Sequence, residues 1–312
     1  MDAVVCNYCG ADDPELVNRG PDLLLDRPGD FQLVRCRRCG LIYQNPRLTP
    51  DELSAHYPPD YQPYKTDPAQ ANRRQRISEE HQLARRGNLL ERHASGRGRL
   101  LDVGCSTGLF LKTMRARGWQ TVGVEPSAYA SAYAREQFGL DVQTGTLESA
   151  EFPSASFDVV SLWDVLEHVT DPRATLTEIA RILRPGGLLA LSLPNPACPE
   201  ARWFGSAWVG WDRPRHLHLF TPPVLRRYLT AAGFDPPVTE SLGGRLGLTL
   251  MSVEFACRAR GIPATRWRPL LGWLYAWPLR LLTWPFYRLA ERLNRTTSMN
   301  VFAVRRWEPT AV

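Results

Sequence analysis

The sequence predicts an α/β fold built on a doubly wound, largely parallel sheet. From residue 98 onward, short apolar runs alternate with amphipathic segments of helical length. A turn rich in small residues follows the first run, in LLDVGCSTGLF at residues 100–110. Glycines let a backbone approach a ligand closely, and sheets of this kind bind ligands where their strands end. We therefore expect a ligand site at this turn.

The elements of the sheet can be assigned in chain order. We expect strands at residues 99–103, 120–126, 140–147, 157–164, 188–195 and 298–306. We expect helices at residues 72–94, 109–118, 127–139, 172–183 and 222–234. An earlier short helix is indicated by Thr49 as N-cap and Pro50 at the first helical position.

The expected organisation has five parts. A zinc-binding module at residues 1–60 is followed by a helical linker at 61–97 and the sheet domain at 98–255. An apolar and basic helical insertion occupies residues 256–296, and residues 297–312 form the final strand and tail.

Two C-x-x-C pairs lie near the N-terminus, at Cys6 and Cys9 and at Cys36 and Cys39. Each pair is followed by a glycine, which allows a tight turn around the sulfurs. Four thiolates form the closed tetrahedral site that Zn²⁺ prefers, with no position left for a substrate. We expect a structural zinc ion here; an iron–sulfur cluster is the alternative.

The composition of the chain bears on its partners and its location in the cell. The net charge of +6 comes from arginines that are spread along the chain rather than gathered in one stripe, which argues against nucleic-acid binding. No secretory signal and no run of about 18 apolar residues is present. Paired cysteines favour a reducing compartment. We expect a cytoplasmic enzyme, with the inner membrane face as an alternative location.

The glycine turn differs from a dinucleotide-binding turn. It reads Asp102-x-Gly104-x-Ser106-x-Gly108, with a carboxylate that would repel phosphate but can hold an ammonium group. Glu125 ends the second strand and can accept hydrogen bonds from two ribose hydroxyls. A ribose and an ammonium without a phosphate are found together in S-adenosylmethionine.

At this point the chain resembles the class I S-adenosylmethionine-dependent methyltransferases, which have a Rossmann-like sheet. The matching segments are LLDVGCSTG, VGVEPS, GTLESAEFPSASFDVVSLWDVLEHVTDP, RILRPGGLLALSLPN and SMNVFAVRR. The resemblance implies that the cofactor contacts Asp102, Gly104, Cys105, Gly108, Glu125, Leu147, Glu148, Trp163 and Asp164. In that set Leu147 and Glu148 flank the adenine, while Trp163 and Asp164 line the methionine end. Ser106 and Thr146 depart from the usual pattern.

The acceptor is expected on the segment after the fifth strand. Trp203, Trp208 and Trp211 there suit the floor of a pocket for a small molecule, although we expect one of them in the core. The cysteine module beside this sheet resembles the sugar C-methyltransferases of deoxysugar pathways, which carry a Y-H-E-H segment. Here only the last histidine of that segment is kept, as His216.

The resemblance implies His216 as the general base. His168, in LEHV, is the rival, and His218 is expected to face the other way if the segment is extended. The predicted function is methyl transfer to a small-molecule acceptor, such as a sugar, a glycan intermediate or a specialised metabolite.

The segment 267–295 combines leucines and tryptophans with flanking arginines. It suits a peripheral membrane surface, a lid or a homodimer surface, and these alternatives stay open. A membrane surface would favour the runner-up function, methylation of a lipid-linked or quinone-like acceptor. A third alternative is a zinc protein that binds nucleic acid or protein.

Overall fold

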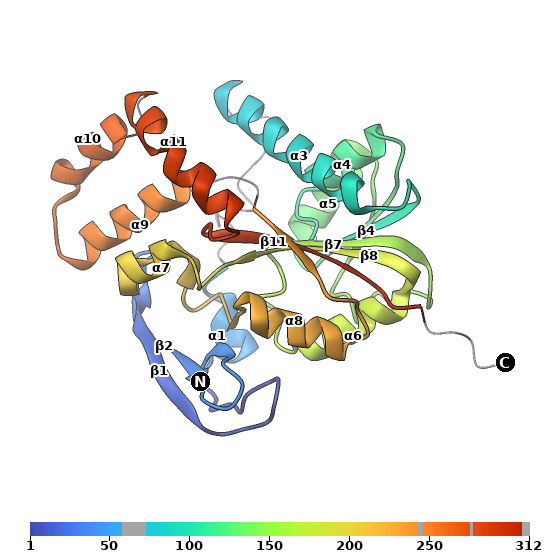
Figure 1. Cartoon of the computed structure of the whole chain (residues 1–312), viewed down its shortest axis with the longest axis horizontal. Coiled ribbons are helices and arrows are strands. Elements are labelled where there is room, and N and C mark those ends of the chain that lie inside the picture. The colour runs from blue at the N-terminus through green and yellow to red at the C-terminus, as the bar shows by residue number, and fades with distance from the viewer. Residues whose placement is uncertain (58–72, 242–245, 275–276, 308–312) are drawn as a thin grey trace.

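The structure is a computed structural model and describes residues 1–57, 73–241, 246–274 and 277–307 (Figure 1). Its strands are β1 (Pro14–Asp22), β2 (Arg27–Cys36), β3 (Ile42–Gln44), β4 (Arg99–Val103), β5 (Gln120–Glu125), β6 (Asp141–Thr144), β7 (Phe157–Trp163), β8 (Leu183–Pro194), β9 (His218–Leu219), β10 (Val238–Glu240) and β11 (Ser298–Val304). Its helices are α1 (Pro50–Ser54), α3 (Arg73–His93), α4 (Leu109–Ala116), α5 (Ala128–Phe138), α6 (Pro172–Ile182), α7 (Pro199–Phe204), α8 (Pro222–Ala231), α9 (Leu246–Ala259), α10 (Ala264–Leu274) and α11 (Trp277–Arg292).

The main sheet has seven strands in the order β10-β11-β8-β7-β4-β5-β6. Strands β8, β7, β4, β5 and β6 pair in parallel, and β11 is antiparallel to both of its neighbours. Helices α3, α4 and α5 lie on one side of this sheet and α6 and α8 on the other (Figure 1). The predicted α/β fold with a doubly wound sheet is confirmed. Its central strands β4 and β7 are buried on both faces, which explains their nearly continuous apolar sequences.

Two strand boundaries differ from the prediction by three residues or more. Strand β6 ends at Thr144 rather than at residue 147, and Gly145 follows with a φ of +144°. Strand β8 begins at Leu183, so residues 184–187 (RPGG), which the prediction left between a helix and a strand, belong to the strand. The early start is supported by the pairing of Phe157 with Leu183 across a register shift.

A second sheet of four strands has the order β1-β2-β3-β9. The hairpin β1–β2 fills the gap between the two cysteine pairs and was missed in the sequence analysis. Strand β9 comes from the segment after the fifth parallel strand and pairs with β3 through Ile42 with Leu219 and Tyr43 with His218. The N-terminal sheet is therefore completed by a strand that the main domain supplies.

Helix α9 starts at Leu246, within the predicted sheet domain, and runs into the predicted insertion at residues 256–296. Helix α9 packs on the segment after α7 through Phe255 and Ala256, and it contacts α10 through Leu250. Residues 275–276, inside the predicted insertion, and residues 61–72 of the predicted linker lie outside the described residues. No helix among the described residues is both long and apolar enough to cross a membrane.

Candidate active site

The turn after β4 requires glycine at two positions. Gly104 and Gly108 have φ values of +69° and +79°. A Cβ on Gly104 would lie 2.7 Å from Val165 Cγ2, and one on Gly108 would lie 2.6 Å from Leu140 Cδ1. The amide of Gly104 donates to the Val124 carbonyl at 2.8 Å, which ties the turn to the end of β5. The turn is thus held in one conformation with its backbone close to both neighbouring strands.

Asp102 lies on β4, just before this turn, and its side chain is 3% exposed. Its Oδ1 accepts a hydrogen bond of 2.6 Å from Ser161 Oγ on β7. Burial raises the pKa of Asp102 to about 7, although the Ser161 hydroxyl and the Arg86 charge both act to lower it. A cation placed beside this carboxyl group would restore its ionised form.

Glu125 ends β5 and is fixed by two backbone amides. Its Oε2 accepts from the Ser106 amide at 2.9 Å and its Oε1 from the Ser127 amide at 2.8 Å. Burial raises the pKa of Glu125, while these two amides act to lower it. Each oxygen keeps lone-pair capacity, so the carboxylate can accept further hydrogen bonds from a ligand.

Three of the predicted cofactor residues point their side chains away from the turn. Cys105 is buried against Gly123 of β5, where a Cβ would lie 2.7 Å from its sulfur. Leu147 belongs to the main core, and Glu148 accepts from Thr175 Oγ1 on α6 at 3.1 Å. The side chains of all three residues therefore make contacts within the protein.

The end of β7 holds an aromatic ring and a carboxylate beside an arginine. Trp163 is buried, and its Nε1 has no hydrogen-bond partner among the described residues. Asp164 accepts from Ser192 Oγ at 2.9 Å and from Arg86 Nη2 at 3.0 Å. The Arg86 guanidinium also lies 5.0 Å from the centre of the Trp163 ring. Arg86 comes from α3 and was missed in the sequence analysis, because its helix looked like a polar linker.

Two of the predicted catalytic histidines meet just beyond β7. The rings of His168 and His216 lie 4.7 Å apart and nearly perpendicular. His168 Nδ1 lies 3.0 Å from the Arg215 carbonyl and 3.1 Å from the Tyr57 hydroxyl, and His216 Nδ1 lies 2.9 Å from the Gly210 carbonyl. Because a carbonyl can only accept, each Nδ1 carries the proton, and each Nε2 keeps a lone pair.

Glu167 is the residue beside this pair that sequence reasoning missed. Its carboxyl group is 1% exposed, and neither oxygen has a hydrogen-bond partner among the described residues. Oε1 lies 4.0 Å from His216 Nε2, and Asp212 Oδ2 lies 3.8 Å from the same nitrogen. Burial raises the pKa of Glu167 well above its usual range and lowers the pKa values of His168 and His216. Both rings are therefore neutral at pH 7.

His218 is placed apart from this pair. It lies on β9, and its Nδ1 donates to the Val169 carbonyl at 3.2 Å. Burial lowers its pKa to about 4. The catalytic role of His218 stays a prediction. In the structure its hydrogen bond joins β9 to the segment after β7.

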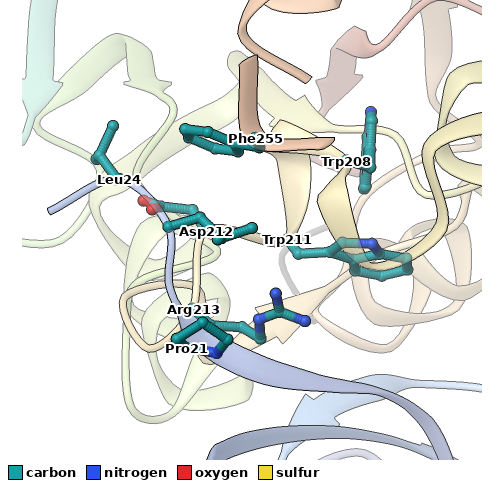
Figure 2. A pocket seen from close by; sticks show the side chains of 8 residues that line it. Pro21, Leu24, Trp208, Trp211, Asp212, Arg213 and Phe255 are labelled. Carbon is teal, nitrogen blue, oxygen red and sulfur yellow. The ribbon is translucent and has the colours of Figure 1, made fainter. Parts of the chain in front are cut away.

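The expectation of an aromatic floor is only partly met. Trp208 and Trp211 are both buried and pack against β2 and β3 through Leu33 and Ile42, whereas Trp203 is 63% exposed. Figure 2 shows Trp208 and Trp211 around a narrow cavity that also borders the end of β1. That cavity holds about 10 Å³, roughly one water molecule, and cannot take a substrate. The sequence analysis placed only one of these tryptophans in the core because it lacked the N-terminal sheet that covers them.

The four N-terminal cysteines converge. The sulfurs of Cys6 and Cys39 lie 3.4 Å apart, those of Cys9 and Cys36 lie 3.6 Å apart, and all four lie within 4.8 Å of one another. All four are free thiols. Zn–S bonds of about 2.3 Å in a tetrahedron give sulfur–sulfur edges of about 3.8 Å, so the cluster fits zinc.

A second group of ligand-type atoms is formed by Glu167, His168 and His216, whose ligand atoms also lie within 4.8 Å of one another. Two imidazoles and a carboxylate can bind a transition metal. The same lone pairs are also those a proton acceptor needs, so the geometry alone leaves both uses available.

Comparison with known proteins assigns the family. Residues 70–238, more than half of the chain, match a family model described as a methyltransferase domain. The ubiquinone biosynthesis O-methyltransferase of Cereibacter sphaeroides (strain ATCC 17025 / ATH 2.4.3) is 36% identical over 149 residues, covering 44% of this chain and 60% of that protein. The enzyme of the same name from Bradyrhizobium sp. (strain ORS 278) is 36% identical over 147 residues, covering 42% of this chain and 56% of that protein. The chain thus spans about 60% of the length of these curated relatives.

A solved structure shares the fold. Phosphoethanolamine N-methyltransferase 2 of Haemonchus contortus, in complex with phosphomonomethylethanolamine and S-adenosylhomocysteine, superposes with a TM-score of 0.50 at 18% identity. The match covers 72% of this chain and 53% of that one. Together with the strand order and the glycine turn, the family match shows that the chain belongs to the methyltransferase domain family as a class I S-adenosylmethionine-dependent methyltransferase.

Proposed function

We propose that this enzyme methylates a hydroxyl group of a small-molecule acceptor and that His216 removes the acceptor proton. The observation that carries the proposal is the pair of neutral, neighbouring imidazoles at the end of β7, each with its Nε2 lone pair available. A hydroxyl acceptor is supported by the relatives, which are named O-methyltransferases.

The cofactor is proposed to bind across the ends of β4, β5 and β7. Asp102 would hold its ammonium group and Glu125 its ribose hydroxyls, with the glycine turn between them. Trp163 and Asp164 would border its methionine end, where Trp163 Nε1, which has no hydrogen-bond partner within the described part of the chain, can donate to the ligand. When bound, this cofactor supplies an activated methyl group on a sulfonium.

The chain's own residues then have two tasks. They hold the acceptor oxygen in line with the methyl group, and they accept its proton at His216 Nε2. A lowered pKa makes His216 a weaker base than a free imidazole but keeps it unprotonated and ready at pH 7. Once His216 has taken the proton, the Asp212 carboxylate, whose Oδ2 lies 3.8 Å from His216 Nε2, can stabilise the imidazolium charge.

The identity of the acceptor stays open between two classes. The first is a sugar, a glycan intermediate or a specialised metabolite, in line with the resemblance to the sugar C-methyltransferases. Of their Y-H-E-H segment only His216 is kept in sequence, yet a tyrosine hydroxyl and a carboxyl group do lie beside the histidines, from Tyr57 and Glu167. That arrangement supports the first class.

The second class is a lipid-linked or quinone-like acceptor at a membrane surface. On α11 and at the residue that follows it, four apolar side chains are between 56% and 77% exposed: Leu282, Trp284, Leu289 and Leu293. Arg288 stacks on the Trp284 ring at 5.5 Å, which brings a cation to this apolar face. Co-sedimentation with phosphatidylglycerol vesicles, compared with phosphatidylcholine vesicles, tests this class; no binding to either would leave the first class.

The experiment for the base uses alanine variants of the three candidate histidines and of one control histidine. Transfer of a labelled methyl group is first screened over nucleotide-linked sugars, phenols and catechols. We expect His216→Ala to lower turnover by ~10²–10⁴ and to leave the affinity for S-adenosylhomocysteine within a few-fold. His218→Ala should have a smaller effect, and His81→Ala, on the exposed face of α3, serves as the control.

Turnover of His168→Ala decides between the two neighbouring rings. If His168→Ala is inactive while His216→Ala turns over like the wild type, the base is His168 and the assignment of His216 is wrong. If none of the screened acceptors is methylated by the wild-type enzyme but vesicle-bound quinone analogues are, the second class replaces the first.

A further inference from the structure

Arg215 forms a buried ion pair with the N-terminal module. Its guanidinium is wholly buried, and Nη1 and Nη2 bind the two carboxylate oxygens of Asp22 at 2.7 and 2.8 Å. Asp22 is the last residue of β1 and is also wholly buried. A two-pronged contact of this kind fixes both the distance and the plane of the guanidinium.

The same arginine holds the segment that carries His216. Its Nη2 binds Asp212 Oδ1 at 2.6 Å, and its Nε lies 3.1 Å from both Asp212 oxygens. The Asp212 carbonyl accepts from the His216 amide at 3.0 Å, and the Arg215 carbonyl accepts from His168 Nδ1 at 3.0 Å. Side chain and backbone of Arg215 thus contact the groups that orient both rings.

Asp22 is held by further partners on its own side. His56 Nδ1 lies 2.8 Å from Oδ2, and the amides of Leu24 and Leu25 donate to Oδ1 at 3.1 and 3.0 Å. Figure 2 shows Pro21 and Leu24 facing Asp212 and Trp211 across the narrow cavity. With only about 10 Å³ between the two surfaces, a shift of β1 is transmitted to the loop rather than absorbed.

We propose that Asp22 is a positioning residue of the active site: through Arg215, this carboxylate of the cysteine module fixes the loop at residues 212–216 and with it the His168–His216 pair. The proposal rests on the proposed function in that the pair acts at the acceptor. The N-terminal module is on this view a part of the acceptor site, although it lies outside the region matched by the family model.

The first test is Asp22→Asn, which keeps the shape of the side chain and removes its charge. We expect kcat to fall by ~10–100-fold, because small displacements of reacting groups cost about this much, while the affinity for S-adenosylhomocysteine in calorimetry stays within about twofold. Asp30→Asn is the matched control: Asp30 lies on the same hairpin but is exposed, 3.7 Å from Arg19, and should leave kcat unchanged.

The second test separates positioning from a structural role. If Asp22 acts through the histidine pair, Asp22→Asn should cost little when added to His216→Ala, so the two effects will not multiply. Arg215→Lys, which keeps the charge but loses the two-pronged contact, should reproduce the fall in kcat, and it replaces Asp22→Asn if that variant does not fold.

The outcomes distinguish this proposal from the proposed function. Wild-type kcat in folded Asp22→Asn and Arg215→Lys overturns the positioning role, whatever His216→Ala shows. An equal loss of cofactor affinity and of kcat would overturn it as well, since it would indicate a general loss of structure. Wild-type turnover in His216→Ala overturns the base assignment alone, provided that Asp22→Asn still lowers kcat.

Discussion

The two ends of the proposed active site are built in different ways. The proposed cofactor end is formed by β7, β4 and β5, which are neighbours in the sheet, and local backbone amides hold its Glu125 carboxylate. The acceptor end joins segments that are far apart in the chain, namely Asp22 and Tyr57, Glu167 and His168, and residues 210–218. A change in the N-terminal module should therefore affect the acceptor end and spare the cofactor end.

Charge is arranged differently at the two ends as well. The cofactor end holds the carboxyl groups of Asp102 and Glu125, and burial raises the pKa values of both. At the acceptor end Asp22 and Asp212 share the Arg215 guanidinium, which lowers the pKa of Asp22. At the first end the Arg86 charge only partly offsets the effect of burial on Asp102, so a cation on the ligand can still stabilise the ionised carboxyl group. At the second end the protein itself supplies the cation that holds both carboxylates.

Loss of the predicted zinc gives the largest expected effect, and it tests most directly whether the acceptor end depends on the N-terminal module while the cofactor end does not. Cys36→Ser, or chelation of the metal, should abolish acceptor methylation, because zinc binding supplies folding free energy to the module that provides β3 and Asp22. Calorimetry with S-adenosylhomocysteine should still report an affinity within a few-fold of the wild type.

The control is Cys257→Ser, which changes a cysteine of α9 outside the cluster. Elemental analysis should find one zinc ion per chain. Two ions per chain would indicate that Glu167, His168 and His216 also bind metal, and protein purified without chelator that contains no zinc would contradict the site. Full turnover after verified zinc loss would show that the acceptor end does not depend on the zinc-bound module, and a large loss of cofactor affinity would show that the two ends are not separate.

Removing the Glu125 carboxylate tests the cofactor end, because this change should weaken cofactor binding, which zinc loss should leave unchanged. Glu125→Ala should weaken binding of S-adenosylhomocysteine by at least ~10–100-fold, because it removes the acceptor for two ribose hydroxyls and each hydrogen bond to a charged group contributes about 1.5–3 kcal/mol. The measurement is calorimetry, with Glu136→Ala on the exposed side of α5 as the control. Equal affinity in Glu125→Ala, or tighter binding of NAD than of the sulfonium cofactor by the wild type, contradicts the assignment.

The difference between the two ends also explains what could be predicted from the sequence. The glycine turn, Asp102 and Glu125 depend on backbone conformation and strand ends within 25 residues, and such features leave a local pattern. Six of the seven strands of the main sheet were predicted for the same reason, since each has a local apolar pattern of its own, whereas the short strand β10 was not predicted.

The acceptor end left no such pattern. Asp22 is one aspartate in a hairpin whose strands were not recognised, and Glu167 and Arg215 are charged residues that hydropathy places on the surface. Their burial follows from the packing of β1 and β9 against the main domain, which is a long-range property. The cysteine pairs predicted that a module exists but not that it reaches the histidines.

The pH dependence of cofactor binding is the smallest expected effect and concerns Asp102. Burial raises the pKa of its carboxyl group to about 7 in the ligand-free protein, above the value of about 4 in an unfolded chain. Between these values the folded protein binds more protons than the unfolded chain, so this group's contribution to stability is lost as the pH rises through 7. An ammonium group on the ligand interacts with the ionised form only, so binding should become tighter over the same pH range, by about tenfold from pH 6 to pH 8.

Calorimetry of S-adenosylhomocysteine binding at several pH values, in two buffers of different ionisation enthalpy, measures both the affinity and the protons released. Near pH 7 binding should release about half a proton, because about half of the Asp102 groups are protonated before the ligand arrives. Glu125 also has a raised pKa, so Asp102→Asn is needed to assign the effect: this variant should bind more weakly but with little pH dependence. An affinity that is constant from pH 6 to pH 8 in the wild type, or that increases toward low pH, would show that Asp102 does not face the ammonium group. The buried carboxyl group of Asp102 would then have a structural role beside the glycine turn and no role in holding the ligand.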